Sequence, residues 1–275
     1  MSSWLNEFLF GMYPYIALTV FFVGSLARFD TGQYTWKSDS SQLLSQRRLR
    51  LGSNLFHIGI LGIFGGHRVG LLTPLPVWHL LGVSAAAKQM LAIVAGGIFG
   101  LLTLAGLGLL IARRLSEPRI RATTRTMDWA VLWLLIAQLL LGLATLPLSW
   151  EHRSGEEMLK FMAWAQHIVT FQGDAASFVA DASPVFKLHL LLGMTIFVVF
   201  PFSRLVHMFS LPLAYIIRPP QKVVWNSVRR GEAIAWQAPQ QESRRQFLKA
   251  GLGLTAAFAL LSLGVLDKFV RYFKK

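Results

Sequence analysis

Residues 53–70 read SNLFHIGILGIFGGHRVG, an almost wholly apolar stretch that contains two histidines, His57 and His67. Ionisable side chains are costly inside a lipid bilayer, so they usually face the interior of a helical bundle and have a function. The stretch predicts a membrane-spanning helix, and its two histidines are the first candidate functional residues.

The composition of the whole chain agrees with a membrane protein. Of 275 residues, 54% are hydrophobic and only 15% are charged, and the mean hydropathy is +0.49. The apolar runs are continuous and about 20 residues long, which favours helices over the shorter alternating strands of a barrel. The predicted fold is an all-α integral membrane helical bundle with five transmembrane helices. The predicted spans are 8–28, 51–72, 89–112, 128–149 and 186–215.

The basic residues of the connecting segments predict the orientation of the bundle. The connections after the first and third spans carry ten Lys and Arg residues, whereas those after the second and fourth carry five. Cytoplasmic loops are the ones enriched in Lys and Arg, so we expect the N-terminus outside the bacterial cytoplasmic (inner) membrane. This distribution explains the formal charge of +14 without nucleic-acid binding. The start, MSSWLNEF, has no basic region and does not resemble a signal peptide.

The fourth connection, 151–187, contains the amphipathic stretch EEMLKFMAWAQHIVTF. One interpretation is a helix lying on the membrane surface, with Phe161 and Trp164 facing lipid. The other is a helix packed over the mouth of the bundle.

Four of the seven histidines lie within predicted spans: His57 and His67 on the second, His189 and His207 on the fifth. The two spans run in opposite directions, so we expect His57 to pair with His207 near the cytoplasm and His67 with His189 near the outer face. The rise is about 15 Å from His57 to His67 and about 27 Å from His189 to His207 in continuous α-helices. Two pairs at two depths are hard to explain as packing residues.

Each pair is interpreted as the axial ligands of one b-type haem. The chain has no cysteine, so it offers no thiolate ligand and no covalent haem attachment. Two ligands are too few for a zinc or copper site. Two imidazoles would leave no open iron position, which is typical of electron transfer. The alternatives are a transporter or channel whose histidines relay protons, and a passive membrane anchor.

Several ordered motifs resemble the gamma subunit of respiratory nitrate reductase. They are YPYIA (13–17), GQYTW (32–36), SNLFHIGILGIF (53–64), LLTP (71–74), KQM (88–90), RRL (113–115), RIRATT (119–124) and FPFSRLVH (200–207). The likeness runs from about residue 4 to 225. Residues 1–225 are therefore predicted to form a dihaem cytochrome b membrane domain.

The resemblance implies that His67 and His189 bind the distal haem, and that His57 and His207 bind the proximal one. It also implies a quinol site beside the distal haem in which Lys88 is the catalytic residue. A cation there can hydrogen-bond a quinol oxygen and stabilise developing negative charge.

Arg114 and Ser40 match positions that meet haem propionates in the family, and Arg204 is a similar candidate. Arg68 departs from the apolar residue expected after a distal ligand. The resemblance does not make His79, His152 and His167 ligands; they are interpreted as solvated or interfacial.

The resemblance implies oxidation of quinol near the outer face, with its protons released there. Electrons would pass through the two haems to an iron–sulfur beta subunit on the cytoplasmic side, and a molybdenum-containing alpha subunit would reduce nitrate. The chain would thus be the quinol-oxidising subunit of a nitrate reductase. The nearest alternative is the same module in a formate dehydrogenase or hydrogenase.

Residues 226–275 form a C-terminal extension beyond the resemblance. It contains SRRQFLK (243–249), which resembles a twin-arginine export signal, followed by the apolar stretch 250–266. A sixth membrane helix is the preferred interpretation; a remnant of a fused partner or a surface segment are the others.

Overall fold

The computed structural model describes residues 3–37 and 47–210. The helices belong to one compact unit, Met1–His207, and no β-strand occurs in the described residues. Five helical stretches are long and apolar enough to cross a membrane: Ser3–Thr35, Leu49–Leu72, Ala85–Ser116, Thr126–Glu151 and Pro184–Phe202. The predicted all-α membrane bundle with five spanning helices is therefore confirmed. The predicted boundary at 225/226, the sixth helix and Ser40 lie outside the described residues.

The first stretch combines α1 (Ser3–Glu7), a π-helical turn η1 (Phe8–Met12), α2 (Tyr13–Gly32) and a 3-10 turn η2 (Gln33–Thr35). The next spanning helices are α3 (Arg47–Leu72), α5 (Ala85–Ser116) and α7 (Thr126–Glu151), separated by the short helices α4 (Leu75–Leu80) and α6 (Pro118–Ala122). The Ser84 hydroxyl accepts from the backbone N–H of Ala87 at 3.2 Å and so caps the start of α5.

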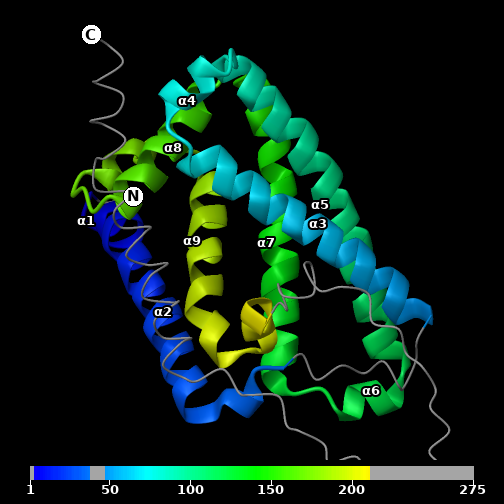
Figure 1. Ribbon diagram of the computed structural model, residues 1–275. Helices are drawn as coiled ribbons and strands as arrows, with labels where there is room; N and C mark the ends of the chain where they lie inside the picture. The colour runs from blue at the N-terminus through cyan, green and yellow to red at the C-terminus, as the bar shows by residue number, and fades with distance from the viewer. Residues whose placement is uncertain (1–2, 38–46, 211–275) are drawn as a thin grey trace, which may run out of the picture. The chain divides into compact units, whose positions relative to one another are not determined.

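Neighbouring helices pack in the order α3, α5, α7, α9, α2, as Figure 1 shows. The contact between α3 and α5 depends on glycines. A Cβ on Gly59 would lie 2.6 Å from the backbone nitrogen of Thr103 and 2.8 Å from the carbonyl of Phe99. A Cβ on Gly106 would similarly lie 2.7 Å from Cα of Phe56. Small residues let the two backbones approach, as is usual between membrane helices.

The fifth spanning helix is shorter than predicted. The prediction of one helix over 186–215 is wrong, because α9 (Pro184–Val199) ends before a 3-10 turn η4 (Phe200–Phe202). Pro201 has no backbone N–H to continue the helical ladder, and Ser203 is extended with φ −116° and ψ 179°. His207 therefore lies in a separate 3-10 segment, η5 (Arg204–Ser210), and not five turns beyond His189 on one helix.

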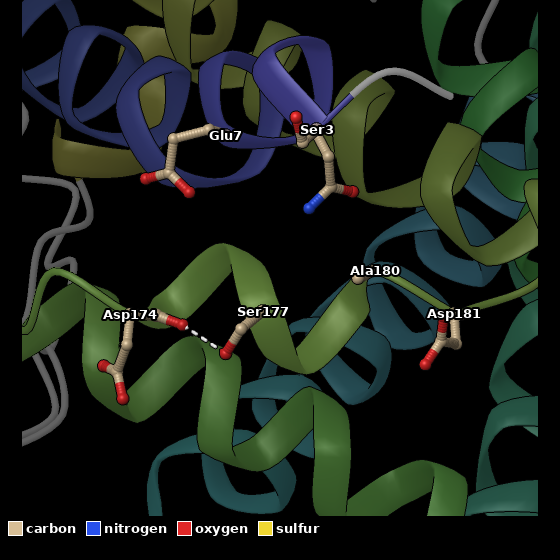
Figure 2. Close-up of a pocket in the computed structure, with 7 residues that line it drawn as sticks. Ser3, Glu7, Asp174, Ser177, Ala180 and Asp181 are labelled. Atoms are coloured by element: carbon tan, nitrogen blue, oxygen red, sulfur yellow. Dashed lines mark hydrogen bonds between the residues drawn. The ribbon is translucent and has the colours of Figure 1, made fainter.

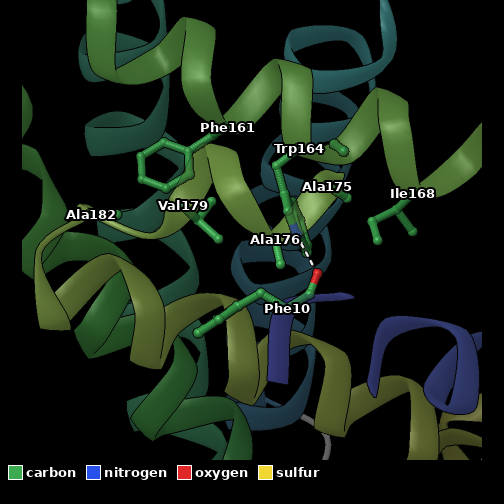
Figure 3. Close-up of a cluster of buried hydrophobic side chains, with 9 residues drawn as sticks. Phe10, Phe161, Trp164, Ile168, Ala175, Ala176, Val179 and Ala182 are labelled. Atoms are coloured by element: carbon green, nitrogen blue, oxygen red, sulfur yellow. Dashed lines mark hydrogen bonds between the residues drawn. The ribbon is translucent and has the colours of Figure 1, made fainter. Parts of the chain in front are cut away.

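The connection between α7 and α9 folds over one end of the bundle. Its helix α8 (Glu156–Val169) and the 3-10 helix η3 (Ala175–Val179) enclose a hydrophobic cluster with residues of η1 (Figure 3). Phe161 is 8% exposed and Trp164 is 3% exposed, and the indole N–H of Trp164 donates to the carbonyl of Phe10 at 2.8 Å. Of the two predicted arrangements, α8 adopts the packed one. The interpretation in which Phe161 and Trp164 face lipid is wrong.

Candidate functional site

The structure brings His57 and His207 together. His57 lies on α3 and His207 on η5, and their ring centres are 6.2 Å apart with 77° between the ring planes. Although α9 ends early, the chain after it turns so that η5 still meets α3.

His67 and His189 form the second pair. His67 lies near the other end of α3 and His189 lies on α9, with ring centres 6.1 Å apart and 43° between the planes. Ten residues of α3 separate the two levels, a rise of about 15 Å.

Local hydrogen bonds orient three of the four rings. Nδ1 of His57 lies 2.7 Å from the carbonyl of Ser53, and Nδ1 of His67 lies 2.9 Å from that of Ile63. Nδ1 of His207 lies 2.6 Å from the carbonyl of Arg204. A carbonyl can only accept, so Nδ1 carries the hydrogen in each neutral ring and Nε2 keeps a lone pair for a metal.

His189 is held differently. Its ring packs against α7, where Nε2 lies 3.4 Å from the amide nitrogen of Gln138. A Cβ on Gly142 would lie 3.0 Å from Cε1 of the ring, so glycine lets the ring lie close to α7. Nδ1 is buried and has no hydrogen-bond partner among the described residues.

The spacing of both pairs fits one metal held between two rings. A ring nitrogen lies about 1 Å from the centre of its imidazole and about 2 Å from a bound transition metal, so two rings sharing a metal have centres roughly 6 Å apart. No group of three or more His, Cys, Asp or Glu suited to a metal occurs in residues 3–37 and 47–210. A macrocycle such as haem could supply the remaining ligands of a metal held by either pair.

The glycines of α3 divide into two groups. Gly59 and Gly62 face α5, where a Cβ would overlap Thr103 or Phe99, whereas Gly65 and Gly66 have nothing within 4 Å of such an atom. Gly70, three residues after His67, has nothing within 4 Å either, so Gly65, Gly66 and Gly70 leave room for a flat ring to approach the backbone of α3.

Lys88 is buried near the pair of His67 and His189. It lies in the first turn of α5, is 3% exposed, and its ammonium donates to the carbonyl of Gly70 at 2.7 Å. Gly70 is three residues after His67, nearly one turn along α3. The ammonium also contacts the Met162 sulfur and lies 4.8 Å from the centre of the Trp78 ring. Sequence reasoning missed both of these neighbours, which come from distant segments.

Arg114 lies in a charged cluster at the opposite end of the bundle. Its guanidinium lies 3.9 Å from a carboxylate oxygen of Asp128, and Arg204 binds the other oxygen at 3.0 Å. Arg204 is also the residue whose carbonyl orients His207. The cluster thus lies beside the pair of His57 and His207, and its two guanidinium groups meet the carboxylate of Asp128.

Of the histidines not predicted as ligands, His79 and His152 are exposed. His167 lies 2.7 Å from a carboxylate oxygen of Asp174, and this hydrogen bond lowers the pKa of the Asp174 carboxyl. Arg68 is exposed on α3.

A pocket of about 400 Å³ lies between the start of the chain and η3 (Figure 2). Its lining is polar and acidic, with Glu7, Asp174 and Asp181. No histidine and no lysine lines it, so it is separate from the candidate site.

Arg28 is a further residue that sequence reasoning missed. It is one of the ten basic residues of the first and third connections that predict the orientation, and its guanidinium binds the backbone of the turn that precedes His207. No sequence signal distinguishes it from the other basic residues of those connections, because its partners are backbone carbonyls.

The fold and the site together define the class of protein. It is an all-α membrane protein in which two histidines of α3 each pair with a histidine from another part of the chain. The family model described as nitrate reductase gamma subunit matches residues 6–226. The respiratory nitrate reductase 2 and 1 gamma chains of Escherichia coli (strain K12) are 51% identical over 225 residues and 50% identical over 221 residues. These alignments cover 81% and 80% of this chain and 98% of each relative.

The nitrate reductase gamma chain of Bacillus subtilis (strain 168) is 38% identical over 214 residues, 78% of this chain and 95% of the relative. The chain belongs to the nitrate reductase gamma subunit family, as the sequence motifs predicted.

Proposed function

We propose that this chain is the membrane cytochrome b subunit of a respiratory nitrate reductase, which oxidises quinol near the outer face of the bacterial cytoplasmic membrane. The observation that carries the proposal is the spacing of the two histidine pairs, 6.2 Å and 6.1 Å between ring centres. His57, His67 and His189 lie on helices able to cross a bilayer, and His207 follows the last of these helices. Family membership favours nitrate reductase over a formate dehydrogenase or hydrogenase.

His57 and His207 would hold a proximal b-type haem, and His67 and His189 a distal one. When bound between two imidazoles, each haem supplies one-electron transfer with no open position for a substrate. The Nδ1 hydrogen bonds of His57, His67 and His207 leave the Nε2 lone pair of each ring available, so Nε2 would be the atom that binds the haem iron. Arg114 and Arg204 are candidates to bind haem propionates, as is Ser40.

Lys88 would bind the quinol. An ammonium group has three donors, and one is used on the carbonyl of Gly70. Another can donate to a quinol oxygen and stabilise the negative charge that develops as the quinol loses its proton. Quinol loses two electrons and two protons on becoming quinone, and the protons would leave on the outer side.

The relatives are named as gamma chains of nitrate reductases, so we infer that this chain also works within a multi-subunit complex. An iron–sulfur beta subunit on the cytoplasmic loops would accept the electrons, and a molybdenum-containing alpha subunit would reduce nitrate. Because electrons cross the membrane while protons remain outside, the reaction would contribute to the proton-motive force.

The test is the haem content of the purified complex, with reduced-minus-oxidised spectra. We expect two haems per chain, falling to one with the proximal signal lost in His57→Ala, because one imidazole alone leaves an axial position empty. The matched control is His79→Ala, an exposed histidine outside both pairs, which should keep both haems.

Two results would contradict the proposal. A wild-type complex without haem absorption would favour the proton-relay alternative. Full quinol-dependent activity in His57→Ala would favour the passive anchor.

A further inference from the structure

The position of His207 needs an explanation that α9 cannot supply. The helix ends at Val199, and an extended residue, Ser203, separates it from η5. A ligand on a continuous helix is placed by the helix itself, whereas a ligand beyond a break must be placed by contacts of the turn.

Arg28, near the end of α2, provides those contacts. Nη1 of its guanidinium donates to the carbonyl of Pro201 at 2.7 Å and to that of Ser203 at 2.6 Å. These carbonyls follow the end of α9, where backbone oxygens have no partner within the helix. Unpaired carbonyls are costly in a bilayer, so the charged donor stabilises this one conformation of the turn.

The other side of the guanidinium is fixed as well. Nη2 donates to the carbonyl of Thr35 at 3.0 Å, and Nε donates to its hydroxyl at 3.1 Å. Arg28 therefore ties three points of the backbone together with its planar fork. A lysine ammonium keeps the charge but lacks this fork.

Packing on α2 supports the same contact. A Cβ on Gly24, one turn before Arg28, would lie 2.9 Å from Cγ of Pro201, so glycine lets the turn approach the helix. The ring of Phe21 meets that of Phe200 edge to face, with centres 4.8 Å apart. The turn is thus held against α2 on both sides of Pro201.

We infer that Arg28 is a positioning residue for the proximal haem: it fixes the turn after α9 so that His207 reaches the level of His57. The inference rests on the proposed function, because it concerns the haem assigned to that pair. Only three residues lie between Ser203 and His207, and the Ser203 hydroxyl accepts from the N–H of Leu205 at 3.1 Å. A shift of the turn is therefore passed on to the ligand.

The experiment compares Arg28→Ala and Arg28→Lys with wild type in the assembled complex. The readouts are haem per chain, the midpoint potential of each haem and the electron paramagnetic resonance signal of each ferric haem. We expect both variants to lose the proximal haem or to change its signal and potential, while the distal haem is unchanged. The control is Arg119→Ala, which removes an exposed arginine and should change neither haem.

The distal haem reports whether the bundle has folded. If Arg28→Ala loses both haems, the result for Arg28→Lys decides between the two explanations. A change confined to the proximal haem in Arg28→Lys supports the inference. Loss of both haems in Arg28→Lys as well overturns the inference in favour of a general role of Arg28 in folding. Two haems with wild-type signals and potentials in both variants would also overturn it. A wild-type complex without haem would instead refute the proposed function itself.

Discussion

Local hydrogen bonds set the tautomer of two histidines of the candidate site. In α3, the rings of His57 and His67 each donate from Nδ1 to the carbonyl four residues earlier. Such a bond needs only a regular helix, so these two tautomers follow from local structure. His189, whose Nδ1 makes no such bond, depends on the packing of α7.

Among single residues, Lys88 is expected to affect quinol oxidation most directly. Replacing it with alanine would remove the proposed charge-assisted hydrogen bond to quinol, worth about 1.5–3 kcal/mol. We expect kcat/KM for quinol to fall about ten- to hundredfold, since about 1.4 kcal/mol corresponds to a factor of ten. Assays of quinol-dependent nitrate reduction measure this kcat/KM. The Lys88→Ala complex should keep both haems.

Lys160→Ala is the matched control for Lys88. This lysine lies on α8, pairs with Glu157 at 3.0 Å and is partly exposed, so its loss should leave kcat/KM unchanged. An Lys88→Ala complex with wild-type kcat/KM would exclude Lys88 from the quinol site.

At the scale of elements, the close contact of α3 with α5 holds the helix that carries His57 and His67. Gly59 is buried in this contact, and a Cβ there would meet backbone atoms of Phe99 and Thr103, which cannot move aside as a side chain can. The helix that presents two of the four candidate ligands is therefore held mainly by backbone proximity.

Gly59→Ala is expected to destabilise the protein by about 1–3 kcal/mol through overpacking. The midpoint temperature of unfolding in detergent measures this loss of stability. Gly108→Ala is the control, because Gly108 lies on α5 with nothing within 4 Å of an added Cβ. Its midpoint should stay the same or rise, since alanine stabilises an open helix position by about 0.5–1 kcal/mol. Equal midpoints for the two variants would contradict the close contact.

For the whole molecule, the basic residues predict that α7 and α9 are joined on the outer side of the membrane. Because the chain has no cysteine, single cysteines can test this without background. In intact spheroplasts, a membrane-impermeant thiol reagent should label Ser154→Cys, in the outer connection, and leave Ser116→Cys, at the cytoplasmic end of α5, unlabelled. The reverse pattern would invert the topology and place Lys88 on the cytoplasmic side.

Much of the architecture was predictable. Hydropathy located all five spanning segments, because a bilayer requires long apolar helices whatever their packing. The motifs of residues 13–207 predicted the family. The end of α9 was missed, because an apolar run continues past Pro201 and hydropathy does not register a backbone break.

The sequence by itself determined the helical class, the approximate positions of the five spanning segments and the three histidines within them, His57, His67 and His189, since these depend on composition and on local chain order. Only the tertiary structure decided that α8 covers the bundle, that Lys88 lies against Gly70 and Trp78, and that Arg28 holds the turn before His207. These contacts join segments far apart in the chain, and their partners are largely backbone carbonyls, which every residue possesses and no sequence pattern reveals.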